Sequence, residues 1–249
     1  MRLATWNVNS LGARLARVQA WVEEFQPDVL CLQELKASID QLPVWLIDLE
    51  GYWCYWHGDK GYSGVGLHIR KDACSERPAF FHPSFDFEHR IVTARLPELI
   101  VASVYVPNGG KDYAAKITFM KSLAEWARRV HGEGRSLVLC GDINITRSDM
   151  DVHPRERKPG IIGQRPEERE LFDLLLSENL VDVGRALDPD NASLYTWWPP
   201  WRNMRARNIG WRIDYLLANR TLAERARVSQ VRSGFGTSDH APVVASFEG

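Results

Sequence analysis

The apolar stretches of this chain are short, and this limits what it can fold into. The longest stretch without a charged residue is 99–110, which has 12 residues. A membrane-spanning helix needs about 20 consecutive apolar residues, so we do not expect an integral membrane protein. Residues 1–7 contain no apolar core of a signal peptide, so we expect no secretory leader either. The short runs instead predict buried strands, which alternate with amphipathic segments.

The order of these segments predicts the fold class. An early strand–helix–strand unit is followed by strand pairs without helices between them, which favours packed mixed sheets with outer helices over a doubly wound parallel sheet. Strands are predicted at 2–8, 29–32, 64–69, 91–95, 99–106, 137–140, 213–217 and 242–247. Helices are predicted at about 13–25, at about 113–130 and from Pro166 onward. Because no linker or repeat interrupts the chain, we expect residues 1–249 to form a single domain.

The composition is that of an ordinary globular protein. The 249 residues include 31 Lys and Arg and 32 Asp and Glu, for a net charge of −1. Hydrophobic residues make up 45% of the chain and charged residues 25%, which excludes a disordered chain, and the balanced charge excludes a polycationic tail. Four cysteines are present and none is spaced as a CxxC pair, so we expect buried, reduced thiols, with no disulfide framework and no zinc site. Reduced thiols indicate a cytoplasmic protein.

Polar side chains follow several of the predicted strands. The runs 5–9, 32–36, 140–144 and 236–242 each end an apolar stretch on acids, amides or histidine, and Asp214 lies within a predicted strand. An unpaired buried Asp is costly, so these groups are expected to meet where the strands converge. Such a cleft would hold Glu34, Asp142, Asp214, Asp239, His240, Asn7, Asn9 and Asn144. Each of these residues alone would be read as a turn former, a helix cap or a structural histidine, and it is their co-occurrence that indicates a site.

The donor types in this set indicate a particular chemistry. Carboxylates with amides and few thiols favour Mg²⁺, or Mn²⁺ as a substitute, over Zn²⁺. A cation held in this way can polarise a phosphoryl oxygen and neutralise developing charge. His240, oriented by Asp214, could then contact a scissile phosphate or the attacking water.

Seven motifs in order resemble one family over almost the whole chain. They are Trp6-Asn7-Val8-Asn9-Ser10, Gln33-Glu34-Leu35-Lys36, Gly61-Tyr62-Ser63-Gly64-Val65-Gly66, Tyr105-Val106-Pro107-Asn108, Gly141-Asp142-Ile143-Asn144, Gly210-Trp211-Arg212-Ile213-Asp214-Tyr215 and Ser238-Asp239-His240-Ala241-Pro242. The chain resembles the exonuclease III family of apurinic/apyrimidinic (AP) endonucleases, in the endonuclease/exonuclease/phosphatase superfamily that includes DNase I. The resemblance implies a four-layered α/β sandwich of two packed mixed sheets flanked by helices, with the active site at one end.

The resemblance also implies roles for the residues of the expected cleft. It implies Glu34 as the main metal ligand, with Asn7 and Asp239 near the ion. The implied catalytic residues begin with Asp142, which handles a proton, and Asn144, which positions Asp142. Tyr105 and His240 are implied to contact the phosphate or the water, and Asp214 is implied to hold His240. Whether Asp142 or His240 activates the water stays open.

Substrate contacts are implied in the same way. Asn108 and Asn203 resemble phosphate or sugar contacts, and Trp197, Trp211 and Ile213 resemble the pocket for a flipped abasic sugar. The chain departs from the family pattern at Asn9, where some relatives carry Asp, at Leu35, where Thr is frequent, and in the tryptophan-rich segment 196–208.

Clustered arginines indicate a nucleic-acid partner. Arg202, Arg205, Arg207 and Arg212 lie in a segment without acids, interleaved with tryptophans and asparagines. Segment 153–166 is also basic. This mixture is typical of surfaces that bind backbone phosphates and stack a sugar or base, so we expect double-stranded DNA as partner.

The expected function is that of a Mg²⁺-dependent DNA phosphodiesterase of base excision repair, acting as a monomer. It would cleave 5′ to abasic sites, act as a 3′→5′ exonuclease or remove 3′ phosphates, with blocked 3′ ends as further substrates. Two alternatives stay open: a superfamily phosphatase acting on lipid or small-molecule phosphates, and an inert DNA-binding module. No membrane-binding stretch supports the first, and the retention of all four carboxylates argues against the second.

Overall fold

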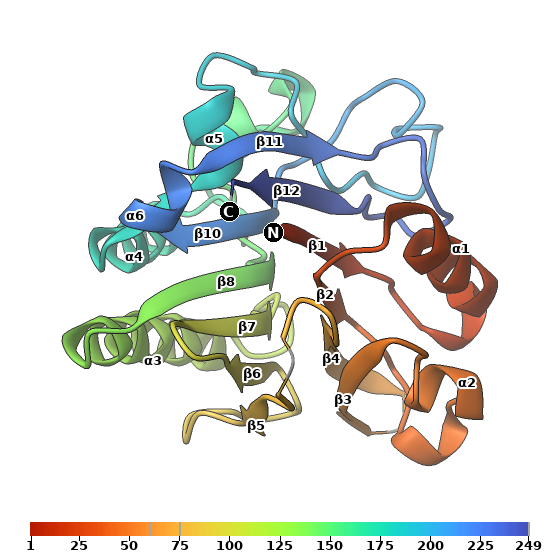
Figure 1. Ribbon diagram of the computed structural model, residues 1–249. Coiled ribbons are helices and arrows are strands. Elements are labelled where there is room, and N and C mark those ends of the chain that lie inside the picture. The colour runs from red at the N-terminus through yellow and green to blue at the C-terminus, as the bar shows by residue number, and fades with distance from the viewer. Residues whose placement is uncertain (60, 75, 249) are drawn as a thin grey trace.

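A computed structural model describes residues 1–59, 61–74 and 76–248. In this part of the chain, twelve strands form two six-stranded sheets (Figure 1). The first sheet has the order β11 (Ala226–Val231), β12 (Val243–Phe247), β1 (Arg2–Asn7), β2 (Val29–Gln33), β4 (Tyr62–Arg70) and β3 (Tyr52–Asp59). The second has the order β5 (Ala79–Phe81), β6 (Ile91–Arg95), β7 (Leu99–Tyr105), β8 (Ser136–Asp142), β10 (Asp214–Asn219) and β9 (Leu180–Asp182).

Helices flank the two sheets. They are α1 (Leu15–Phe25), α2 (Val44–Ile47), α3 (Tyr113–Gly132), α4 (Pro166–Ser177), α5 (Val183–Leu187) and α6 (Arg220–Ala223), with 3₁₀ turns at Gly12–Arg14, Ile39–Gln41, Asp149–Asp151 and Pro154–Glu156. Figure 1 shows α1 and α2 outside the first sheet and α3 and α4 outside the second. No helix in the described residues is both long and apolar enough to cross a bilayer.

The central strands are buried on both faces, which produces the layering. Successive residues of a strand point to opposite faces: in β2, Val29 and Cys31 face the core between the sheets, whereas Leu30 and Leu32 face α1. A third core, containing Phe119 of α3, lies between the second sheet and its helices. The result is a helix–sheet–sheet–helix sandwich, and the predicted fold class is confirmed.

One parallel pair in each sheet places the polar strand ends together. β1 runs parallel to β2, and β7 runs parallel to β8. Their last residues therefore reach one end of the sandwich, where the antiparallel partners β12 and β10 begin. The amide of Asn7 at the end of β1 donates to Asp142 at the end of β8 across 2.9 Å, so the two sheets meet there.

The predicted elements match this arrangement within a few residues. The strand expected at 213–217 instead begins at Asp214, and the helix expected at 13–25 begins with the 3₁₀ turn before α1. Strands β3, β5, β9 and β11 were not predicted, because edge strands show no clean alternation of buried and exposed residues. Of the four free cysteines, Cys31 and Cys140 are buried as expected, and the other two are half-buried.

Candidate active site

A cavity of about 440 Å³ opens where the polar strand ends meet. Among its lining residues are Glu34, Asp142, Asp239 and His240. One ligand atom from each of Glu34, Asp142 and His240 lies within 4.8 Å of the others. Most of the groups expected to converge from distant parts of the chain therefore share one cavity, which we call the acidic pit, while Asn7 and Asp214 are buried beside it.

The buried amide of Asn7 holds two of these carboxylates in place. Its Nδ2 donates to Glu34 Oε1 and to Asp142 Oδ2, both at 2.9 Å. Its Oδ1 accepts from the backbone N–H of Asn9 at 3.0 Å, which fixes the orientation of the amide. Asn7 therefore lies beside a cation site as a hydrogen-bond donor to the carboxylates, and its own oxygen is engaged elsewhere.

His240 lies between two buried aspartates. Its Nδ1 is 2.9 Å from Asp214 Oδ2, and its Nε2 is 3.9 Å from Asp142 Oδ2. Burial alone would lower the pKa of His240, but the charge and hydrogen bond of Asp214, together with the charge of Asp142, raise that pKa to about 10. The imidazole is therefore cationic at neutral pH.

Asp142 is held by the turn that follows β8. The backbone N–H of Asn144 donates to its Oδ1 at 2.8 Å. The Asn144 side chain donates to Val106 O at 2.9 Å and to Asp142 Oδ2 at 3.3 Å. Burial and the negative charges of Asp214 and Glu34 raise the pKa of Asp142 to about 8. A proton acceptor of this pKa suits chemistry near neutral pH.

A lysine completes the wall of the pit beside Glu34. Nζ of Lys36 lies 2.8 Å from Glu34 Oε2 and donates to Asn9 Oδ1 at 2.7 Å. Asn9 in turn donates to Asp239 at 2.8 Å. Burial would raise the pKa of Glu34, but the charge of His240 and the hydrogen bonds from Lys36 and Asn7 lower it. Sequence reasoning assigned Lys36 no role, although it stands in the same motif as Glu34.

Tyr105 reaches the pit from the end of β7. Burial, followed by the charges of Glu34 and Asp142, raises the pKa of Tyr105 well above its usual value, so the phenol keeps its proton. The guanidinium of Arg90 lies over its ring, 4.8 Å from the centroid. Arg90 was missed, because nothing in its sequence neighbourhood distinguishes it from a surface arginine.

Two tryptophans and an isoleucine form the apolar side of the pit. The rings of Trp197 and Trp211 meet edge to face with centroids 5.5 Å apart, and Ile213 lines the same cavity. Trp197 Nε1 donates to Asp239 Oδ2 at 2.9 Å. Asn108 is exposed and also lines the cavity. The expected sugar pocket and metal cluster are therefore contiguous.

The remaining predicted contacts lie outside the pit. Asn203 and Arg205 line a neighbouring cavity of about 1040 Å³, which shares Asn9 and Asp239 with the pit. Arg205 donates to the backbone carbonyls of Ser233, Phe235 and Ser238, at 2.9, 2.9 and 2.5 Å. Its guanidinium therefore braces the loop before His240.

The expectation that Arg212 contributes to a phosphate-binding surface is wrong. It is 2% exposed, and its guanidinium pairs with Asp151 at 2.7 Å and with Asp182 at 2.6 Å. Those two acids lie far from it in the sequence, so the acid-free segment around Arg212 gave no sign of them. Arg202 and Arg207 are exposed, and Arg202 lines the larger cavity.

Comparison with known proteins decides the family. The family model described as Endonuclease/Exonuclease/phosphatase matches residues 4–240. The chain belongs to this family. It is 32% identical to the zebrafish (Danio rerio) DNA repair nuclease APEX1, covering 98% of this chain and 81% of that protein. It is 30% identical to an exodeoxyribonuclease of Bacillus subtilis, covering 98% of each.

Solved structures of this family superpose closely on the chain. The 3′ phosphatase NExo from Neisseria, bound to a product DNA hairpin, has a TM-score of 0.90 at 33% identity, covering 100% of this chain and 99% of the other. An AP endonuclease from Archaeoglobus fulgidus has a TM-score of 0.89 at 28% identity, with the same coverage. The endonuclease/exonuclease/phosphatase assignment and the exonuclease III type of homology therefore extend over the full chain.

The residues of the pit fit the divalent cation on which this family depends. Glu34 and Asp142 offer carboxylate oxygens, which are the ligands that hard cations prefer. Burial and crowded negative charge raise the pKa of Asp142, and a bound cation would offset that charge. This donor chemistry suits an oxygen-coordinated ion better than a thiol-bound one.

Proposed function

We propose that this chain is a Mg²⁺-dependent DNA hydrolase of base excision repair, with Mn²⁺ as a possible substitute. It would cleave the backbone 5′ to an abasic site and process 3′ ends as a 3′→5′ exonuclease and 3′ phosphatase. The observation that carries this proposal is the single pit in which Glu34, Asp142 and His240 face the Trp197–Trp211 wall. The DNA hairpin bound to the Neisseria relative supports a DNA substrate.

In this proposal Asp142 accepts the proton of the attacking water. Burial and the charges of Asp214 and Glu34 raise the pKa of Asp142, which makes its carboxylate a stronger base once a bound cation keeps it ionised, and Asn144 holds it in position. His240 is already cationic, so it donates to a phosphoryl oxygen from Nε2 while Asp214 holds Nδ1. This proposal assigns activation of the water to Asp142 rather than to His240.

Charge at the phosphate is neutralised from the opposite side of the pit. A divalent cation held by Glu34, with Asp239 and Asn7 beside it, would supply Lewis-acid stabilisation of the phosphoryl oxygens. Tyr105 adds a phenolic O–H donor, because its pKa is raised.

Substrate selection follows from the aromatic wall and the rim. An abasic sugar or a 3′-terminal sugar is small enough to sit against Trp197, Trp211 and Ile213, with Asn108 at the phosphate. An abasic nucleotide has no base pair to break when it leaves the helix. The exposed Arg202 and Arg207 would contact backbone phosphates beside the pit.

A side-by-side assay tests this proposal. The purified protein is given an abasic duplex, a recessed 3′ end and a 3′-phosphate nick with Mg²⁺ or Mn²⁺, and inositol phosphates serve as the small-molecule comparison. We expect turnover on at least one DNA substrate, its loss with EDTA and its loss in Asp142→Asn. Turnover of inositol phosphates alone would overturn the DNA assignment, and activity that survives EDTA would overturn the metal dependence.

A further inference from the structure

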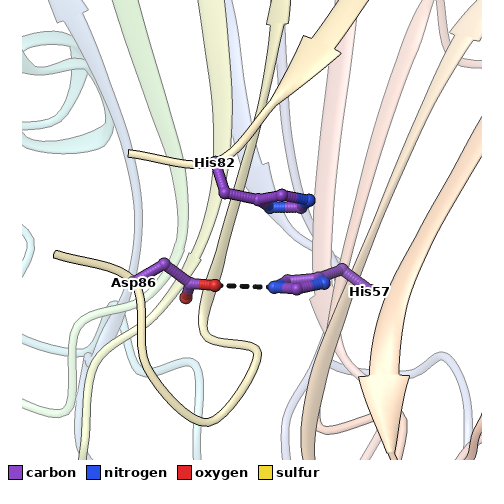
Figure 2. Close-up of side chains that lie close together, drawn as sticks. All are labelled: His57, His82 and Asp86. Carbon is purple, nitrogen blue, oxygen red and sulfur yellow. Dashed lines mark hydrogen bonds and ion pairs between the residues drawn. The ribbon is translucent and has the colours of Figure 1, made fainter. Parts of the chain in front are cut away.

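A second group of metal-ligating side chains lies apart from the acidic pit. His57 belongs to β3 at the edge of the first sheet, and His82 and Asp86 belong to the segment between β5 and β6 at the edge of the second. One ligand atom from each lies within 4.8 Å of the others. Figure 2 shows His82 and Asp86 approaching His57 from across the seam between the sheets. None of the three lines the pit.

The carboxylate of Asp86 is aimed by its own backbone contacts. Its Oδ1 accepts from the N–H groups of Arg90 and Ile91, at 2.9 and 3.1 Å. Its Oδ2 is left to face His57 Nε2 at 2.6 Å. Burial would raise the pKa of Asp86, but the hydrogen bond from His57 and that from the Arg90 backbone lower it, so the group is ionised. A ligand carboxylate fixed through its second oxygen is the arrangement expected around a metal.

The ring of His82 is fixed in the same manner. Its Nδ1 lies 3.2 Å from the carbonyl oxygen of Ile91. A carbonyl can only accept a hydrogen bond, so Nδ1 carries the proton and Nε2 keeps its lone pair. That lone pair now accepts from the hydroxyl of Tyr55 at 2.9 Å. Burial, followed by the charge of His57, lowers the pKa of His82, which favours the neutral, ligating form.

We propose that His57, His82 and Asp86 form a zinc site that joins the edges of the two sheets. Two imidazoles and one carboxylate suit Zn²⁺ rather than the oxygen-preferring Mg²⁺. The site uses no cysteine, so the cysteine spacings gave no sign of it. Water would complete the coordination, because all three residues are half-buried and accessible.

Metal binding requires three local adjustments. His57 Nε2 lies against Asp86 here, so it can bind a metal only when it has released any proton to water and the neutral ring carries its single proton on Nδ1. The rings of His57 and His82 are stacked with centroids 3.8 Å apart, so they must tilt to direct both lone pairs at one ion. The distance between His57 Nε2 and Asp86 Oδ2, which is 2.6 Å here, must also increase to about 3.3 Å. This is the distance between two ligand atoms of a tetrahedral ion with bonds of about 2 Å.

The site would fasten the segment that supports one wall of the pit. Arg90, whose N–H is bonded to Asp86, lies over the ring of Tyr105. Ser63 Oγ of β4 donates to the carbonyl of Glu88 in the same segment. Zinc at the seam would therefore order residues 82–90 without touching the reacting groups.

Zinc titration of the full-length protein in saturating Mg²⁺ tests this proposal. A chromophoric chelator competes for Zn²⁺, and the readouts are the number of retained zinc ions and the Tm. We expect one retained zinc in the wild type and in Glu34→Gln, which removes the pit ligand. We also expect one in His131→Gln, which removes a histidine of α3. His82→Gln and His57→Gln should each weaken binding by about 100-fold or more.

Asp86→Asn provides a control for folding. Its amide oxygen still accepts from Arg90 and Ile91, so the segment keeps its backbone contacts while the ligand charge is lost. We expect its metal-free near-UV circular dichroism to match that of the wild type, and its zinc-induced rise in Tm to disappear. The proposal is overturned if His82→Gln retains as much zinc as the wild type. It is also overturned if Glu34→Gln loses the retained zinc, because the zinc of the wild type would then be bound in the acidic pit.

Discussion

His240 Nδ1 lies 2.9 Å from Asp214 Oδ2, and this buried pair turns the opposite ring nitrogen toward Asp142. The pair connects the loop before β12 in one sheet to the first residue of β10 in the other. Asp214 is therefore a positioning residue for His240, and it also supplies much of the charge that keeps the imidazole protonated.

Replacing Asp214 by Asn should lower kcat by about 10²- to 10⁴-fold, because His240 loses the charge that fixes its orientation and its proton. Duplex binding should persist. The measurement is single-turnover cleavage of an abasic duplex with Mg²⁺, beside a filter-binding assay. Asp173→Asn, at an exposed acid paired with Arg147, is the matched control. An unaltered kcat in Asp214→Asn would contradict this role.

Asp142→Asn should abolish most turnover, with a similar loss of about 10²- to 10⁴-fold, because the amide cannot accept the proton of water. Removal of a negative charge beside the phosphate should leave DNA affinity unchanged or higher. Binding and turnover are to be measured on the same preparation. Loss of binding together with turnover would instead indicate that the variant is misfolded.

Gly141→Ala should destabilise the fold by about 3 kcal/mol. A Cβ at this position would lie 1.9 Å from the carbonyl oxygen of Val104, in the neighbouring strand, and the φ of Gly141 is +149°. Gly132→Ala is the control, since nothing lies within 4 Å of a Cβ there. Urea denaturation measures both variants. A wild-type midpoint for Gly141→Ala would show that β7 and β8 can separate at little cost.

The buried His68 should make the protein acid-sensitive. Burial lowers its pKa to about 3, so below pH 6.5 the unfolded chain binds a proton that the folded chain does not. The contribution of His68 to the free energy of unfolding is fully present above about pH 6.5. It decreases as the pH falls, and about 3 kcal/mol of it is lost at pH 4. His68→Leu should flatten this part of the stability profile, measured by urea denaturation from pH 7 to pH 4. His153→Asn, a partly exposed histidine, should leave the profile as steep as the wild type's.

Arg202→Ala and Arg207→Ala should each weaken DNA binding and reduce the steepness of its salt dependence. The slope of log K against log salt should fall by about 0.9 for each DNA phosphate that the variant no longer neutralises. Arg220→Ala, an exposed arginine of α6, serves as the comparison. If all three variants keep the wild-type slope, the DNA backbone runs elsewhere on the surface.

Much of the pit could be predicted from sequence, because its residues directly follow strands whose apolar pattern is clear. Glu34 follows β2 and Asp142 ends β8, so each was expected at a strand end, and the packing of the two sheets then brings these ends together. Arg212 could not be placed, since its partners Asp151 and Asp182 approach through tertiary packing. The same reason hid the cluster of His57, His82 and Asp86, which the fold assembles from the edge strand β3 and the loop between β5 and β6.

The amide of Asn7 has a consequence that reaches beyond its two hydrogen bonds. It ties a carboxylate carried by one sheet to a carboxylate carried by the other. The relative positions of the reacting groups therefore depend on how the two sheets are aligned. Substitutions in the core between the sheets, remote from any phosphate, would therefore lower kcat if they allowed one sheet to shift relative to the other.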